Sequence, residues 1–332
     1  MKNNHHSVPP LIEARARYGA GQLAYVQTDY EVAVELYRES LALYRSSNDK
    51  QGIALSLSGL GNVAEERCEY SHAQELHEKS LALYRELNDQ RGIATELVYL
   101  GNALKVTNDY DRIAALREES LTLRRALKDK RGIASSLYNV ALSAEVKGDY
   151  ERAMALHKKS LTLRRELDDQ AGVGHSVMAL GKVASLQGKY RQATCWLKES
   201  LSIHERTGDR RAIGHSLLYR GDVAYAQKKY ERARKLYEQT LGIRQELGDK
   251  RGIAEAMALL GRVAFAQEEY QQAIELQEKS LALRQELSES RAIAESLSDL
   301  SDALDARGEH DQAAKLRQEG LVILQAIKGE TG

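Results

Sequence analysis

The chain repeats itself every 40 residues, and this period constrains the fold more than any other feature of the sequence. The clearest copy is Asp249–Leu287, where apolar residues recur at steps of three and four in two successive stretches. Such spacing places them on one face of a helix. The two stretches are separated by Gln267–Glu269, a connection so short that it predicts an antiparallel helix hairpin.

The copies stay in register along almost the whole chain, without insertion or deletion. Small residues recur on both stretches beside constant leucines, a pattern typical of helix backbones that approach closely. A tyrosine opens the second stretch of each copy except the eighth, where His310 replaces it. The repeating positions are the tyrosines Tyr30, Tyr70, Tyr110, Tyr150, Tyr190, Tyr230 and Tyr270, the leucines Leu41, Leu81, Leu121, Leu161, Leu201, Leu241, Leu281 and Leu321, and the small residues Gly21, Gly61, Gly101, Ala141, Gly181, Gly221, Gly261 and Ser301.

A single hairpin cannot bury its apolar face, whereas stacked copies bury a continuous core. We therefore predict an all-α fold, a solenoid of about eight antiparallel helix hairpins. One solenoid is expected over 11–327, between a disordered tail at 1–10 and a polar tail at 328–332. The predicted repeats are 11–48, 49–88, 89–128, 129–168, 169–208, 209–248, 249–288 and 289–327.

An aspartate stands before the first helix of six units and is predicted to cap that helix, because its side chain can accept from free N–H groups of the first turn. Glu289 stands there in the last unit. The glycine that follows in most units, as in Arg251-Gly252-Ile253-Ala254, is predicted to ease packing, since no flanking strand or second glycine suggests a phosphate loop. The predicted caps are Asp49, Asp89, Asp129, Asp169, Asp209 and Asp249.

Charge and cysteine content exclude several classes of protein. The chain has 48 basic and 48 acidic residues, and this balance argues against a general binder of nucleic acid or of anionic membranes. Cys68 and Cys195 stand far apart and form no disulfide framework or metal spacing. No signal peptide is evident, and no apolar run reaches the length that crosses a bilayer. These features predict a cytoplasmic protein.

The repeat resembles the tetratricopeptide repeat. Leu60-Gly61-Asn62 with Ala64 and Tyr70 matches its signature, and the same pattern recurs at Leu260-Gly261. The unit has 40 residues, longer than the standard repeat. In this respect it is similar to the sensor arrays of bacterial signal-transducing ATPases and regulators, and to the Pins-type cell-polarity adaptors of animals. The resemblance covers residues 11 to 327, and it implies that the solenoid is a right-handed superhelix. It identifies the fold more specifically than the function.

In the tetratricopeptide family the first helix of each unit lines a concave groove, and the resemblance implies a peptide-binding groove here. Its residues change freely from unit to unit, whereas the packing positions barely change. Apolar groups are expected in the middle and acidic ones at both ends, which would suit an extended peptide with basic termini. The implied groove residues are Asn62, Glu65, Glu66, Asn102, Lys105, Tyr138, His175, Met178, Lys182, His215, Leu218, Asp222, Tyr225, Arg262 and Phe265.

Catalysis is not expected from these residues. The sequence has no nucleophile elbow, no His-Glu-x-x-His motif and no phosphate loop. His175 and His215 occupy equivalent positions in adjacent units, but no cysteine or third histidine joins them, so no metal site is predicted. No cofactor is predicted either.

The sequence therefore predicts a non-catalytic scaffold that binds a protein or an extended peptide in its groove. Two alternatives stay open at this stage. One is a sensor or regulatory array of a bacterial signalling system. The other is a self-associating or engineered repeat scaffold without a selected ligand, in which the terminal units stack between copies of the chain.

Overall fold

The computed structural model describes residues 9–107 and 109–329. In this part the chain forms sixteen α-helices and one short 3-10 helix, η1, and no strand. The helices are α1 (Pro10–Val26), α2 (Tyr30–Ser46), α3 (Lys50–Glu66), α4 (Tyr70–Glu86), α5 (Gln90–Ala103), η1 (Leu104–Thr107), α6 (Tyr110–Ala126), α7 (Lys130–Val146), α8 (Tyr150–Glu166), α9 (Gln170–Leu186), α10 (Tyr190–Thr207), α11 (Arg210–Ala226), α12 (Tyr230–Glu246), α13 (Lys250–Ala266), α14 (Tyr270–Glu286), α15 (Ser290–Arg307) and α16 (His310–Gly329).

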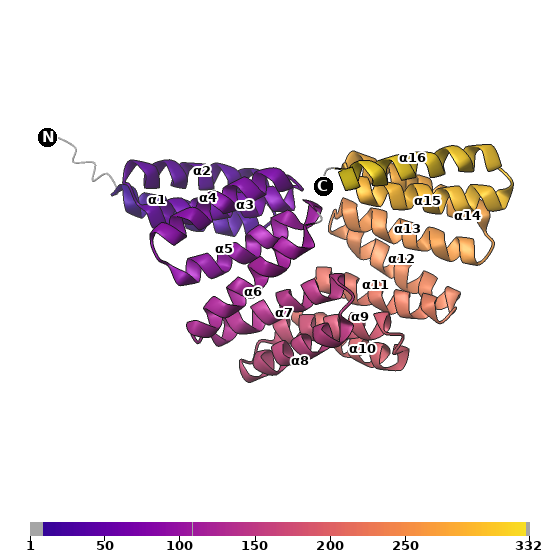
Figure 1. The fold of residues 1–332 in the computed structure, drawn as a ribbon, viewed down its shortest axis with the longest axis horizontal. Coiled ribbons are helices and arrows are strands. Elements are labelled where there is room, and N and C mark those ends of the chain that lie inside the picture. The colour runs from indigo at the N-terminus through magenta and orange to yellow at the C-terminus, as the bar shows by residue number, and fades with distance from the viewer. Residues whose placement is uncertain (1–8, 108, 330–332) are drawn as a thin grey trace. The chain divides into compact units, whose positions relative to one another are not determined.

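The helices fall into two compact units, an N-terminal unit that ends at Lys147 and a C-terminal unit that begins at Gly148. We call the odd-numbered helices first helices and the even-numbered ones second helices. Within each unit every second helix that has neighbours on both sides packs against its own first helix and the next one (Figure 1). The predicted all-α array of helix hairpins is confirmed; its continuity over 11–327 stays a prediction.

The ends of the array differ slightly from the predicted boundaries. Helix α1 begins at Pro10, inside the predicted tail, because proline suits the first position of a helix. Helix α16 runs to Gly329, also inside the predicted tail. The other parts of those two tails, residues 1–8 and 330–332, lie outside the described residues.

The turns between helices share one geometry that recurs every 20 residues. After α2, Asn48 adopts a positive φ of 53°, its N–H donates to Arg45 at 3.1 Å, and the N–H of Asp49 donates to Tyr44 at 3.0 Å. This pattern is the Schellman motif, which satisfies carbonyls at a helix end. The positive-φ positions are Thr28, Asn48, Cys68, Asn88, Lys128, Gly148, Asp168, Gly188, Gly208, Lys228, Gly248, Glu268, Ser288 and Gly308.

After six of the turns between hairpins, an aspartate caps the next first helix, as predicted. Asp49 Oδ1 accepts from the N–H of Gly52 at 3.1 Å, and the five equivalent aspartates make the same kind of bond. Glu289 makes no cap bond through its side chain. A Cβ at Gly52 would overlap the Tyr44 ring, so the packing role predicted for this glycine is also confirmed.

The recurring serine of the second helices allows close packing and also makes a hydrogen bond to the first helix. Ser80 Oγ donates to the carbonyl of Ala54 at 2.9 Å, and Ser280 donates to Ala254 at 2.8 Å. Serines of the next first helix lie beside it, as Ser296 does beside Ser280 at 3.4 Å. These serines are fully buried, and a hydroxyl is tolerated there because it is hydrogen-bonded.

The third hairpin departs from the pattern at Leu104 and Ile113, which stand where most hairpins carry alanine. Helix α5 ends at Ala103, and η1 follows directly. Both bulky residues are buried. A Cβ on Gly101 would find its nearest neighbour at 3.9 Å, whereas one on Gly61 would lie 2.7 Å from His77. The added volume is therefore accompanied by a more open crossing.

The outer faces of the first and last helices of the chain differ in polarity. In α1, Glu13 and Arg17 form an ion pair at 3.2 Å, where later first helices carry Ile53 and Leu57. In α16, Leu321 and Val322 are 49% and 53% exposed. No described helix is long and apolar enough to span a membrane.

Candidate functional site

The side chains implied by the family resemblance lie along the first helices, on what we call the first-helix face. In α11, His215, Leu218, Asp222 and Tyr225 follow one another at steps of three and four, so they share a side of that helix. Their sequence neighbours Leu217, Val223 and Ala224 are buried against other helices. The half-buried or exposed predicted residues are Asn62, Glu65, Glu66, Asn102, Lys105, Tyr138, His175, Lys182, His215, Asp222, Tyr225, Arg262 and Phe265.

Met178 and Leu218 correct the sequence prediction, which placed them as apolar groups facing water. They are only 7% and 4% exposed. Met178 lies in a core cluster with Val223, and Ser216 Oγ donates to its sulfur at 3.7 Å. Their position faces the joint between successive first helices, so they hold hairpins together rather than presenting apolar surface.

In the N-terminal unit the face is rich in tyrosine and glutamate. Tyr25 and Tyr30 donate to the two carboxylate oxygens of Glu66 at 3.5 and 3.3 Å. Tyr99 hydrogen-bonds with Asn62. Burial raises the pKa of Glu65, and the nearby Lys105 ammonium opposes that rise. The structure thus brings Asn62, Glu65, Glu66 and Lys105 into one connected surface.

In the C-terminal unit the two predicted histidines do not form a pair with each other. His175 packs on His204 with ring centroids 5.0 Å apart, and His215 contacts Arg244 Nη2 at 2.9 Å. Burial lowers the pKa of His215 to about 4, and the positive charge of Arg244 adds to this effect. Among the described residues, no three His, Cys, Asp or Glu side chains are grouped so that they could hold a metal ion.

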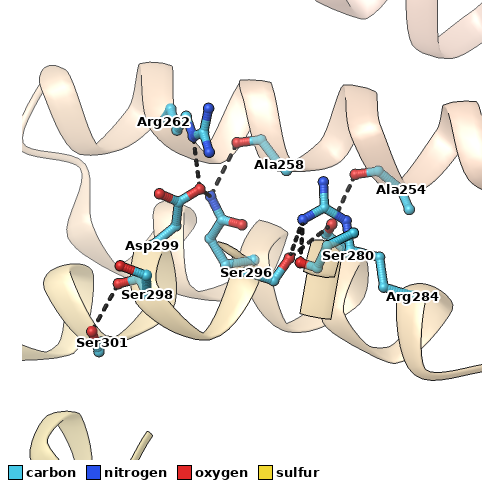
Figure 2. Close-up of polar contacts among 11 residues, drawn as sticks. Ala254, Ala258, Arg262, Ser280, Arg284, Ser296, Ser298, Asp299 and Ser301 are labelled. Carbon is cyan, nitrogen blue, oxygen red and sulfur yellow. Dashed lines mark hydrogen bonds and ion pairs between the residues drawn. The ribbon is translucent and has the colours of Figure 1, made fainter. Parts of the chain in front are cut away.

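Asp222 is the most perturbed acid of the first-helix face. Tyr237 Oη donates to its Oδ1 at 2.8 Å. Burial raises the pKa of Asp222 to about 6, although the hydrogen bond from Tyr237 acts in the opposite direction. Within the described residues it makes no ion pair, and the adjacent Arg262 instead donates through Nε to Asp299 at 2.7 Å (Figure 2).

The two predicted aromatic anchors of this unit lie at the ends of their helices, next to the turn. Tyr225 packs on Tyr230 with ring centroids 5.6 Å apart, and Phe265 packs on Tyr270 at 5.8 Å. Phe265 is still 38% exposed. Lys182 Nζ lies 5.9 Å from the centroid of the Tyr219 ring. This face therefore offers aromatic edges beside separate acidic and basic groups.

Sequence reasoning missed a set of second-helix residues that reach this face from beneath. They pack against the small residue at the helix crossing, as Tyr237 does against Gly221. We call them window residues. A usable signal was present, because this position varies between hairpins as freely as the face does. The window residues within the two units are Tyr37, His77, Arg117, Leu197, Tyr237 and Gln277.

Stacked helix hairpins with this close glycine crossing define a helical repeat protein, and comparison with known families identifies which kind. The tetratricopeptide repeat model matches residues 13–86, 132–206, 212–286 and 252–326. The chain therefore belongs to the tetratricopeptide repeat family, as the sequence resemblance predicted. The comparison with curated proteins finds no match.

Solved structures with the same fold include several regulators. The chain is similar to the Rap conjugation gene regulator of plasmid pLS20, solved with the Phr* peptide, with a TM-score of 0.72 and 14% identity over 98% of each chain. The apo quorum sensor NprR from B. thuringiensis has a TM-score of 0.70 and 15% identity, over 96% of this chain and 89% of that one.

A third similar structure is the signal transduction ATPase PH0952 from Pyrococcus horikoshii, which has a tetratricopeptide repeat sensor. Its TM-score is 0.63 at 14% identity, over 96% of this chain and 49% of that one. At such identities the similarity shows the fold alone.

Proposed function

We propose that this chain binds a protein or an extended peptide through its first-helix face and catalyses no reaction. The observation that carries the proposal is a contrast within the chain. Core positions such as Leu41 and Ser40 recur almost unchanged, whereas half-exposed positions on the first helices vary between hairpins. Stacking accounts for the constant set, and contact with a partner accounts for the varied one.

The fold relatives support this use of the array. The Rap regulator of plasmid pLS20 was solved in complex with the Phr* peptide, and that regulator has the same fold as our chain. NprR is a quorum sensor, and PH0952 is a signal transduction ATPase with a tetratricopeptide repeat sensor. From these relatives we infer a regulatory role for this chain, and this role stays a prediction.

Three aromatic residues are proposed as apolar anchors for the partner: Tyr138, Tyr225 and Phe265. Each lies on a first helix and retains solvent-exposed surface. Aromatic side chains contribute much of the binding energy at protein interfaces. Asn62 and Asn102 are proposed to bond the partner's main chain, because an amide both donates and accepts.

The test is selection from a display library of random peptides, with the wild-type chain and a Tyr138→Ala, Tyr225→Ala, Phe265→Ala variant. A matched control carries Lys198→Ala, Glu238→Ala and Glu278→Ala, three exposed residues of second helices. We expect related peptides to be enriched by the wild type and the control but not by the aromatic variant. Enrichment of the same peptides by all three proteins would overturn the proposal.

Association between copies through the terminal helices is a second candidate, favoured by the exposed apolar residues of α16. Leu321 and Leu324 are 49% and 39% exposed, whereas Leu41 and Leu81 are buried at positions equivalent to Leu321. Light scattering over a concentration series tests it, with Leu321→Glu as the variant and Leu186→Glu, an exposed leucine of the internal helix α9, as the control. A mass that stays monomeric at all concentrations would exclude it.

A further inference from the structure

The window residues occupy buried places and yet are mostly polar. Tyr37, His77, Arg117, Tyr237 and Gln277 are each at most 4% exposed. A Cβ on Gly61 would lie 2.7 Å from His77, and one on Gly261 would lie 2.9 Å from Gln277. The crossing glycine thus leaves a gap in the first helix, and the window side chain fills it. A position whose only task is packing would be expected to be apolar.

The polar ends of these side chains meet residues of the first helices. Tyr237 Oη donates to Asp222, and Gln277 Nε2 donates to the carbonyl of Ala258 at 3.0 Å. The same nitrogen lies 3.4 Å from Asp299 Oδ2, the carboxylate that Figure 2 shows bonded to Arg262. Asp222 belongs to the same hairpin as its window residue, and Asp299 belongs to the next one.

The N-terminal unit shows the same arrangement with other chemistry. His77 Nδ1 lies 3.0 Å from Glu96 Oε2, and Arg117 Nη1 donates to Ser143 Oγ at 2.9 Å. Four of the five polar window residues, all except Tyr37, thus have a hydrogen-bonding group of a first helix within reach. The apolar member, Leu197, packs instead with Met178 in an apolar cluster.

The geometry points to Tyr237, the window residue of the sixth hairpin, as a positioning residue that determines specificity: it orients Asp222, a first-helix side chain that a partner meets. This inference rests on the proposed function. Since Asp222 makes no ion pair within the described residues, the matching partner group is a basic side chain, an arginine or a lysine of the bound peptide.

The test compares Tyr237→Phe with wild type. Loss of the phenol hydroxyl removes the hydrogen bond to Asp222 and keeps the ring that packs on Gly221. Carboxyl NMR titration is expected to give an Asp222 pKa about 1 unit higher in the variant, because a hydrogen bond to a charged group is lost. Tyr230→Phe, on the same helix, is the matched control and leaves that pKa unchanged.

Peptide selection then separates positioning from mere packing. The wild type is expected to enrich peptides with a basic residue, and a synthetic peptide of that sequence should bind Tyr237→Phe about 10-fold more weakly near neutral pH. Its affinity should also fall at a higher pH than in the wild type as the solution is acidified. Tyr237→Gln restores a donor at this position and should recover part of the affinity.

The outcomes are distinct. An unchanged Asp222 pKa, or a shifted pKa with unchanged peptide preference and affinity, overturns the positioning role while the proposed function stands. If the wild type enriches no related peptides, the proposed function fails, and the specificity role fails with it. If Tyr237→Phe does not fold, Tyr237→Leu, which places the residue of the fifth hairpin at this position, takes its place. A raised Asp222 pKa together with weaker binding of the basic peptide supports the inference, and an unchanged pKa or unchanged binding overturns it.

Discussion

The second and sixth hairpins use the same window position for opposite purposes. In the second, His77 meets Glu96, a carboxylate only 2% exposed that also accepts from Ser58 Oγ at 2.6 Å. In the sixth, Tyr237 meets Asp222, which lies half-buried on the first-helix face. The carboxylate of Glu96 is enclosed between hairpins, whereas Asp222 keeps part of its surface in contact with solvent.

The difference arises from where the acid stands in the repeat. Glu96 occupies a position that holds Ser56, Ser136 and Ser176 in other hairpins, inside the joint between neighbours. Asp222 occupies a position of the face. The window residue adjusts to either site, because its backbone place at the glycine crossing is constant. We expect substitutions in the second hairpin to affect folding, and those in the sixth to affect ionisation and binding.

The largest effect is expected for His77→Leu. Leucine fits the window, as Leu197 shows in the fifth hairpin, but the change leaves Glu96 buried without its partner. Breaking a buried pair in this way costs about 3–5 kcal/mol. Urea unfolding of the whole chain measures it.

The control for that prediction is the double variant His77→Leu, Glu96→Ser. It reproduces the combination of Leu197 in the fifth hairpin and Ser216 in the sixth, so most of the lost stability should return. A single variant as stable as wild type would show that the contact between His77 and Glu96 contributes nothing to folding.

The next largest effect is expected when a methyl group is added at the crossing glycine. Gly61→Ala and Gly221→Ala each force a methyl group against the window ring and should cost about 1–3 kcal/mol. Gly101→Ala is the matched control, since its nearest neighbour would be 3.9 Å away, and alanine in a helix gains about 0.5–1 kcal/mol over glycine. Equal melting temperatures for all three variants would contradict a tight crossing.

Asp222→Asn should raise stability by about 1–2 kcal/mol near neutral pH. Burial raises the pKa of Asp222 to about 6, so the folded state holds this proton more tightly than the unfolded chain does. That advantage is complete below the ordinary pKa of an aspartate and is lost as the pH rises through about 6. The gain from the substitution should therefore disappear in acid, which unfolding curves at several pH values would reveal.

The smallest effects concern the serine position. Ser80→Ala removes a bond to the carbonyl of Ala54 in another helix and should cost about 1 kcal/mol. In the sixth hairpin, Thr240 bonds chiefly within its own helix, to Leu236 at 2.9 Å, and reaches Gly214 only at 3.5 Å. Thr240→Val should then cost less than Ser80→Ala. The reverse order would show that the two helices of each hairpin are not joined as the distances indicate.

The sequence predicted the hairpins, the caps and the constant core because these depend on local spacing and on a strict period. Asp49 caps its helix and Gly52 packs on Tyr44 as expected. Most predicted face residues do lie on the first-helix side. What could not be predicted was the depth of each side chain, and for Met178 and Leu218 the assumption of exposure was wrong.

How deeply a side chain is buried depends on how far one hairpin is displaced relative to the next. That displacement is not encoded in the spacing within a single helix. Met178 was judged by its place on α9 alone, whereas its burial comes from α11, through Ser216 and Val223. The window residues were missed for the same reason. Tyr237 belongs to a second helix, and only the close crossing at Gly221 brings its hydroxyl to Asp222.

The turn that recurs every 20 residues makes the hairpins interchangeable building blocks. Asn48 and Asn88 have the same φ of 53°, and each is followed by an aspartate that starts the next helix. A chain cut and rejoined between two such asparagines keeps its backbone geometry at the junction. Arrays with hairpins deleted, duplicated or reordered can therefore be assembled at these points, and the length of the binding surface becomes adjustable in steps of one module.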